Sequence, residues 1–350
     1  MSVRVGIGLF TAQLPSGSAR LFAQEYAETL ELVRLAEHVG FDSAWVSEHH
    51  GSSDGYLPSL LPMLAAFAAV TERIELGTAV VLTPLHDPLR LAEDAAVVDQ
   101  LSAGRLILGL GNGSRQEEFR MFGLSMNDRG LRTEEAIEVL RRAWSGRRFS
   151  FEGRTLRYDR VKVTPPPARA EGPPIVLGGY ARRAVERAGR LADGYVTDET
   201  GPDELRENLG IVDRAAQSVG RDGSELSIVL LQNVFVTREG EPWRDGDPWT
   251  LLRAGLAQQL GVYEAWDAGA DTPELDRLDP VMPSEDDLRL LTPAGSPEEV
   301  LGALLPIARE FGDRDLHLVV RLHYPGMDLE TAATAVELFA SDVLAALKAG

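Results

Sequence analysis

The chain repeats one pattern, a short apolar strand followed by an amphipathic helix, and this repetition limits the folds that it can adopt. Alternating apolar residues at 3–9 predict a strand, and apolar residues at helical spacing over 22–39 predict a helix that ends at Gly40. A second apolar run at 43–46 is followed by a predicted helix at 58–70. The alternation is therefore present from the start of the chain.

The same alternation continues to the other end of the chain. Asp87 followed by Pro88 is typical of a helix start, and the segment Ser296–Glu299 has the residues of a capping box. The remaining strands are predicted at 73–82, 104–111, 174–179, 194–197, 226–237 and 316–322. The remaining helices are predicted at 88–102, 133–144, 181–192 and 202–219, from Pro297 onward, and at 328–348.

Eight strand-then-helix units predict an α/β fold, a single (β/α)8 TIM barrel over 1–350, with active-site groups where strands run into the following loops. Two insertions interrupt it: a hairpin with a proline-rich connection at 145–173, and an acidic insertion at 240–295 with a helix of its own at 248–266. A doubly wound open sheet is the alternative architecture. The glycines of 109–113 lack the spacing of a dinucleotide-binding fingerprint.

Composition excludes several classes of partner. The chain has 54 acidic and 35 basic residues, a net charge of −19, so neither nucleic acid nor an anionic membrane surface is expected to bind it. The absence of cysteine excludes disulfides and thiolate metal sites. The opening segment has no signal-peptide pattern, and no stretch approaches the ~20 apolar residues of a membrane span. We therefore expect a cytoplasmic protein.

Two adjacent histidines, His49 and His50, follow the second predicted strand, on the face where barrel enzymes place their chemistry. An imidazole titrates near neutral pH, which suits a general acid or base. The alternative is that one ring packs against the barrel rim while the other is solvated. A metal site is a weaker alternative, because Glu48 followed by two adjacent histidines matches no common ligand spacing, and no metal is predicted.

A second candidate site is the turn Gly178, Gly179 and Tyr180, at the end of one predicted strand and directly before a helix. Backbone N–H groups at such a turn bind phosphate, and the helix dipole favours its charge. Arg182 or Arg183 would add a charged contact. The alternative is a plain tight turn with solvated arginines.

Several segments together resemble the luciferase-like flavin-dependent oxidoreductases, the family of the bacterial luciferase alpha subunit. They are "GFDSAWVSEHH", "ERIELGTAVVLTPLHDPLRLAEDAAVVDQLSAGRLILGLGNG", "EEFRMFG", "PIVLGGYARRAVERAGRLADGY" and "GSPEEV", in the order and spacing of that family. The resemblance implies a barrel that binds a flavin at its carboxyl-terminal mouth. The cofactor is usually reduced FMN delivered by a flavin reductase, and a deazaflavin in some members.

The resemblance also assigns roles to residues. Thr78, Ala79 and Val80 are expected to back the flavin ring, often through a non-prolyl cis peptide; without the resemblance they would be ordinary small core residues. Asn112 aligns with a position that reaches the flavin phosphate or ribityl chain. The turn Gly178–Tyr180, with Arg183, corresponds to the phosphate cradle. The reactive cysteine of luciferase aligns with Gly111, so light emission is not implied.

Catalytic roles follow from the same resemblance. His49 is expected to be the general acid or base that acts on a flavin peroxide and its substrate, and His50 its neighbour or orienter, although their order is open. Glu48 would tune either ring. His323, after the last predicted strand, is a further catalytic candidate, with a non-catalytic place on the barrel rim as its alternative.

Three functions are compatible with these residues. The first is a two-component, FMN-dependent monooxygenase acting on a small organic substrate. The second is a deazaflavin-dependent hydride-transfer enzyme on the same fold, and the third is a noncatalytic barrel subunit of a hetero-oligomer. Relatives are commonly homodimers, and the apolar helix at 58–70 suits either an interface or burial. The aromatic residues of 240–290 would form either a substrate lid or the core of the insertion.

Overall fold

The parallel sheet of this protein closes on itself. The computed structural model describes residues 3–15, 17–198, 201–238 and 292–349. Its main sheet has nine strands in the order β3-β2-β1-β13-β10-β9-β8-β5-β4, and β3 also pairs with β5, which closes the sheet. Since β3 and β4 are two pieces of one predicted strand, the result is an eight-stranded (β/α)8 barrel, as predicted.

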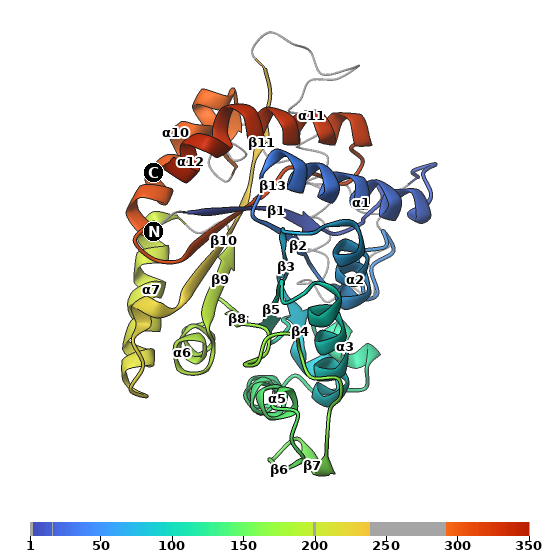
Figure 1. Ribbon diagram of the computed structural model, residues 1–350, viewed down its shortest axis with the longest axis vertical. Helices are drawn as coiled ribbons and strands as arrows, with labels where there is room; N and C mark the ends of the chain where they lie inside the picture. The colour runs from blue at the N-terminus through green and yellow to red at the C-terminus, as the bar shows by residue number, and fades with distance from the viewer. Residues whose placement is uncertain (1–2, 16, 199–200, 239–291, 350) are drawn as a thin grey trace. The chain divides into compact units, whose positions relative to one another are not determined.

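The strands and helices alternate along the described chain (Figure 1). The strands are β1 Arg4–Phe10, β2 Ser43–Val46, β3 Glu75–Thr78, β4 Val81–Leu82, β5 Leu106–Gly111, β6 Phe149–Glu152, β7 Arg157–Val161, β8 Ile175–Gly178, β9 Gly194–Asp198, β10 Ser227–Asn233, β11 Phe235–Val236, β12 Ala294–Gly295 and β13 Leu316–Arg321. The α-helices are α1 Phe22–Val39, α2 Leu60–Val70, α3 Pro88–Leu101, α4 Gln116–Met121, α5 Arg129–Trp144, α6 Arg182–Leu191, α7 Pro202–Gln217, α10 Pro297–Phe311, α11 Leu329–Phe339 and α12 Ala345–Ala349.

Helix starts and stops follow from local sequence chemistry. The Asp87 side chain accepts hydrogen bonds from the backbone of Leu89 and Arg90 at the start of α3. At the start of α10, Ser296 and Glu299 form both hydrogen bonds of a capping box. Gly40 ends α1 in the left-handed conformation, with φ of 100°. These three predictions are confirmed.

The chain forms two compact units. Unit 1 comprises residues 1–45, 49–58 and 230–350, and unit 2 comprises 46–48 and 59–229. In unit 1, β1 pairs with β13 in parallel from Arg4 opposite His317 to Ile7 opposite Val320. In unit 2, β5 pairs in parallel with β3, β4 and β8, and α6 lies beside α7 (Figure 1).

Two predicted strands are interrupted, which corrects the prediction. The strand at 73–82 breaks at residues 79–80, where the backbone N–H of Ala79 donates to the Val46 carbonyl. The strand at 226–237 breaks at Val234, because the Tyr324 hydroxyl hydrogen-bonds both its N–H and its carbonyl, each at 3.0 Å. The Val234 N–H also donates to the Arg321 carbonyl.

The insertions and terminal helices refine the prediction further. The hairpin predicted within 145–173 is confirmed as β6 and β7, which pair in antiparallel fashion. The last predicted helix is interrupted by a π-helical turn at Ala340–Leu344. The helix predicted at 248–266, with the aromatic residues of that insertion, lies outside the described residues.

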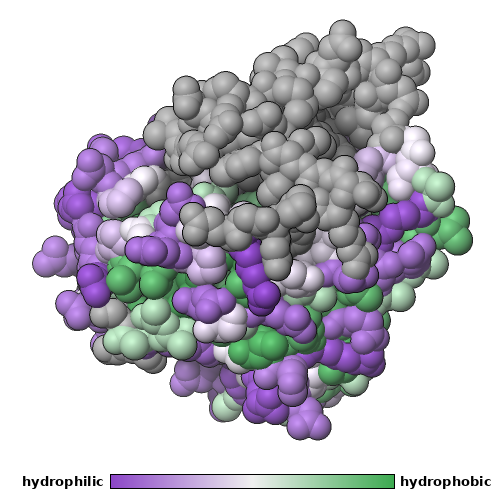
Figure 2. All heavy atoms as spheres, turned by 90° about the horizontal axis from the view of Figure 1, so that it is seen from above, coloured by the Kyte–Doolittle hydropathy of each residue, from purple (hydrophilic) through white to green (hydrophobic). Residues whose placement is uncertain are grey.

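The surface of the described residues is mixed in polarity. Figure 2 shows apolar side chains in small patches among hydrophilic ones. Helix α2 buries most of its large side chains, including Leu64 and Phe67, so core packing accounts for much of its apolar sequence. In the part of the chain that the structure describes, no helix is both long and apolar enough to cross a lipid bilayer.

Candidate active site

The histidine pair lies in the loop after β2, in unit 1. Both rings are half-buried. The His49 backbone N–H donates to the Leu57 carbonyl at 3.3 Å, and its ring meets Tyr56 edge-on, with centroids 4.8 Å apart. The Leu57 N–H in turn donates to the Thr11 carbonyl at 2.8 Å. His49 is therefore held in place by a loop that is itself attached to the segment following β1.

A buried carboxylate organises this loop. Asp54 is 3% exposed, and its oxygens accept hydrogen bonds from the Gln13 amide at 2.5 Å, from the Ser52 hydroxyl at 2.5 Å and from the Tyr56 backbone at 3.1 Å. The Leu14 N–H also donates to the Asp54 carbonyl at 2.9 Å. Hydrogen bonds to a charged acceptor are stronger than neutral ones, so Asp54 is the main polar anchor of the histidine loop.

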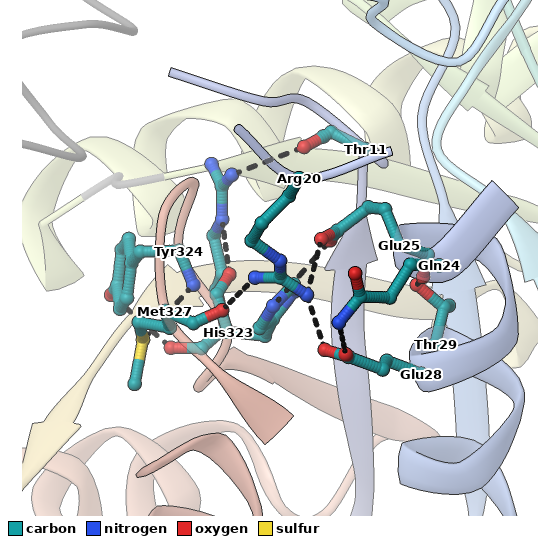
Figure 3. Close-up of polar contacts among 10 residues, drawn as sticks. Thr11, Arg20, Gln24, Glu25, Glu28, Thr29, His323, Tyr324 and Met327 are labelled. Carbon is teal, nitrogen blue, oxygen red and sulfur yellow. Dashed lines mark hydrogen bonds and ion pairs between the residues drawn. The ribbon is translucent and has the colours of Figure 1, made fainter. Parts of the chain in front are cut away.

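His323, the third predicted catalytic residue, also lies in unit 1, directly after β13 (Figure 3). Its side chain is 11% exposed, and its Nε2 atom lies 3.6 Å from Oε1 of Glu25. The ring is tilted against Phe10, with centroids 6.4 Å apart. The predicted position at a strand end is confirmed, but the approach of Glu25 was not predicted.

In unit 2, Glu48 pairs with a histidine that the sequence reasoning missed. His86 Nε2 lies 2.9 Å from Oε1 of Glu48, whose side chain is 1% exposed. The Glu48 carboxylate also accepts from the Leu82 N–H at 3.3 Å. Burial lowers the pKa of His86, but the hydrogen bond and charge of Glu48 outweigh burial, so the net pKa is raised. The sequence offers no local signal for this contact, because Glu48 and His86 belong to different strand-then-helix units.

We expect Glu48→Gln to lower the pKa of His86 from its wild-type value, because burial is then opposed only by the charge of Asp94. An NMR titration of the histidine ring protons, with the His86 signal assigned from His86→Gln, measures the change. Glu93→Gln, also near the start of α3, serves as control and is expected to leave the titration where it is. An unchanged His86 pKa in Glu48→Gln would contradict the pairing.

The segment predicted to back the flavin ring lies in unit 2, next to two glycines. A Cβ atom on Gly111 would come within 2.5 Å of Val80 Cγ2, and one on Gly178 would come within 3.3 Å of Val80 Cγ1. Thr78 is fully buried, and its hydroxyl hydrogen-bonds both the N–H and the carbonyl of Gly109 at 2.8 Å. The Ala79–Val80 peptide bond is cis. The Val80 side chain therefore occupies space that a side chain at position 111 or 178 would need, and both positions are glycine.

The turn predicted to bind phosphate follows β8. Gly179 has φ of 151°, and a Cβ atom there would lie 2.5 Å from the Cβ of Ala184. No side chain caps the N-terminus of α6 at Ala181. Arg182 pairs with Glu186 at 2.9 Å, whereas Arg183 is exposed and forms no ion pair with any described residue. Arg183 is therefore the arginine available to an anion, and this turn fits a phosphate group.

Two further residues complete the description of this region. The exposed Tyr180 donates its hydroxyl to Asp198 at 2.6 Å, and burial raises the pKa of Asp198 although that hydrogen bond lowers it. Asn112, half-buried after β5, makes no side-chain hydrogen bond with the residues the structure describes. Its amide is therefore free to contact a ligand.

Barrel enzymes place their active sites at the carboxyl ends of the strands, and a helix N-terminus there can bind the phosphate of a ligand. Residues 3–314 match the family model described as luciferase-like monooxygenase, so the chain belongs to that family. These findings together identify a flavin-dependent oxidoreductase of the luciferase-like family.

Individual relatives differ in activity. The chain is 29% identical over 334 residues to an F420-dependent glucose-6-phosphate dehydrogenase of Nakamurella multipartita, covering 92% of this chain and 93% of the relative. It is 31% identical over 214 residues to the uncharacterized protein y4vJ of Sinorhizobium fredii, where the match spans 61% of either chain. Among solved structures, monooxygenase RslO1 from Streptomyces bottropensis superimposes with a TM-score of 0.80 at 27% identity, covering 98% of this chain and 99% of that one.

Proposed function

We propose that this protein is the oxygenating component of a two-component monooxygenase, which receives reduced FMN from a flavin reductase and oxygenates a small organic substrate. The observation that carries the proposal is the fit of unit 2 to a phosphate-bearing flavin, through Val80 between two glycines and the uncapped start of α6. Oxygenation rather than another redox reaction is supported by the likeness to monooxygenase RslO1, which extends over nearly the whole chain.

Each part of the site has a task under this proposal. The backbone of Gly178–Tyr180, the N-terminus of α6 and Arg183 would bind the phosphate, and Asn112 would bind the phosphate or ribityl chain. Thr78, Ala79 and Val80 would back the ring. Reduced flavin supplies the electrons with which molecular oxygen is activated. His49 would hold or move a proton at its imidazole nitrogen, with His50 beside it in sequence.

A deazaflavin-dependent hydride transfer is the second candidate. The F420-dependent relative from Nakamurella multipartita matches more than nine-tenths of the chain, which favours this alternative specifically. Both cofactors carry a phosphate group, so the turn before α6 serves either one. The difference lies in the reaction with oxygen, because a reduced deazaflavin donates hydride and reacts poorly with oxygen.

Binding separates the candidates before any substrate is known. We expect anaerobic titration of the protein to give tighter binding of reduced FMN than of reduced F420, and we expect the FMN complex to consume oxygen when mixed with it. Arg183→Ala is expected to weaken FMN binding about tenfold, since a charge-assisted phosphate contact is lost, while Arg182→Ala, the neighbouring paired arginine, serves as control. Preferential F420 binding would favour hydride transfer, and binding of neither would favour a noncatalytic subunit.

A further inference from the structure

A buried carboxyl group lies behind the imidazole of His323, within unit 1 (Figure 3). Glu25 belongs to α1, and its side chain is only 2% exposed. Its Oε1 atom is 3.6 Å from Nε2 of His323, whose own side chain is 11% exposed. A carboxyl group buried this deeply is rare unless a partner or a bound proton compensates its charge.

The surrounding contacts fix both side chains. Nη2 of Arg20 lies 3.1 Å from Oε2 of Glu25 and also contacts Glu28. Nη1 of Arg20 donates to the Met327 carbonyl at 2.6 Å, and the Met327 backbone acts to raise the pKa of His323. Figure 3 shows these side chains converging from α1, from the segment before it and from the loop after β13.

The approach of the two side chains limits how a proton can be shared between them. Nε2 is the nitrogen of His323 that faces Glu25, 3.6 Å from Oε1. A neutral imidazole has one N–H donor and one acceptor nitrogen. Where Nε2 is the acceptor, a protonated carboxyl group can donate to it and a carboxylate cannot.

The charges nearby agree with this reading. The pKa of Glu25 is raised to about 7, mainly by burial. The charge of Arg20 lowers this pKa, and the charge of Glu28 raises it. Burial lowers the pKa of His323 to about 4, with further lowering by Arg321 and Arg20. Near neutral pH the imidazole is consequently neutral, and the carboxyl group is the member of the pair that gains and loses a proton.

We propose that Glu25 is a positioning residue for His323, and that its buried carboxyl group, when protonated, offers a donor to Nε2 and holds the ring at the end of β13. When Glu25 loses this proton, its carboxylate only accepts hydrogen bonds. The imidazole then faces an acceptor in place of a donor, so one proton changes how the ring is held.

The first test uses the protein without cofactor or substrate, so it does not depend on the proposed function. An NMR titration follows the ring signals of His323, assigned from His323→Gln. We expect a step centred near pH 7 that reports ionisation of Glu25. Glu25→Gln keeps an N–H donor at the same place, so the step is expected to vanish. Glu28→Gln, the matched control, is expected to retain the step but to shift it to lower pH, because the charge of Glu28 raises the pKa of Glu25. Absence of the step in the wild type, or its persistence in Glu25→Gln, would overturn the proposal.

The second test rests on the proposed function and measures the pH profile of turnover. The wild-type rate is expected to fall as pH rises through 7, whereas the rate of Glu25→Gln is expected to stay level, because the amide always donates. Glu25→Ala, which lacks the donor, is expected to be slow at all pH values. Identical profiles for wild type and Glu25→Gln would overturn the positioning role. If no turnover is found with either cofactor, the proposed function is wrong, and the NMR titration alone decides the proposal.

Discussion

Gly109→Ala is expected to destabilise the fold severely, although it adds a single methyl group. Gly109 is buried in β5, and a Cβ atom there would overlap the carbonyl oxygen of Thr78. Backbone cannot move aside as the end of a side chain can. The Thr78 hydroxyl, which hydrogen-bonds Gly109 on both its N–H and its carbonyl, would also be displaced. We expect a loss of about 4 kcal/mol in the free energy of unfolding, since overpacking costs about 1–3 kcal/mol and buried groups left without hydrogen bonds cost about 1–3 kcal/mol more.

Gly302→Ala is the matched control for this prediction. Gly302 is exposed in α10, and no atom lies within 4 Å of the position where its Cβ would be. Alanine is the better helix former, so this variant is expected to be about 1 kcal/mol more stable than the wild type. Thermal and denaturant unfolding, followed by circular dichroism, measure both variants. Wild-type stability for Gly109→Ala would show that β3 and β5 are not as close as the structure has them.

The local signals in the sequence predicted most of the architecture. Helix caps could be recognised because Asp87 and Ser296 act on backbone groups within a few residues. The strand break at Val234 could not, because it depends on the Tyr324 hydroxyl, 90 residues away in the sequence. Hydrophobic periodicity contains no information about such distant hydrogen bonds.

The site shows the same division between local and distant contacts. The positions of His49 and His323 after strands were predictable from the order of elements. Their neighbours were not, since Glu25 and His323 stand near opposite ends of the sequence. Glu48 and His86 are likewise in different strand-then-helix units. A carboxyl side chain on the buried, mostly apolar face of a helix, as Glu25 is on α1, is the signal that sequence reasoning could have used.

His49→Ala is expected to have the largest effect on turnover among single substitutions of the histidine loop. The structure fixes this residue through the Leu57 carbonyl and the Tyr56 ring, so its imidazole has a defined place. If it transfers a proton during the reaction, its loss lowers kcat by about 10²–10⁴-fold, the usual contribution of a general acid or base. Binding of reduced FMN is expected to be unchanged, because the proposed phosphate and ring contacts come from other residues.

The controls separate a chemical role from a structural one. His38→Ala removes an exposed imidazole from the last turn of α1 and is expected to leave turnover within about twofold, as for other surface substitutions. Asp54→Asn weakens the anchor of the loop without removing an imidazole, so it is expected to lower kcat by less than His49→Ala does. Turnover within twofold of wild type in both His49→Ala and His50→Ala would show that neither imidazole moves a proton in the reaction, and the assignment of this loop to catalysis would then be wrong.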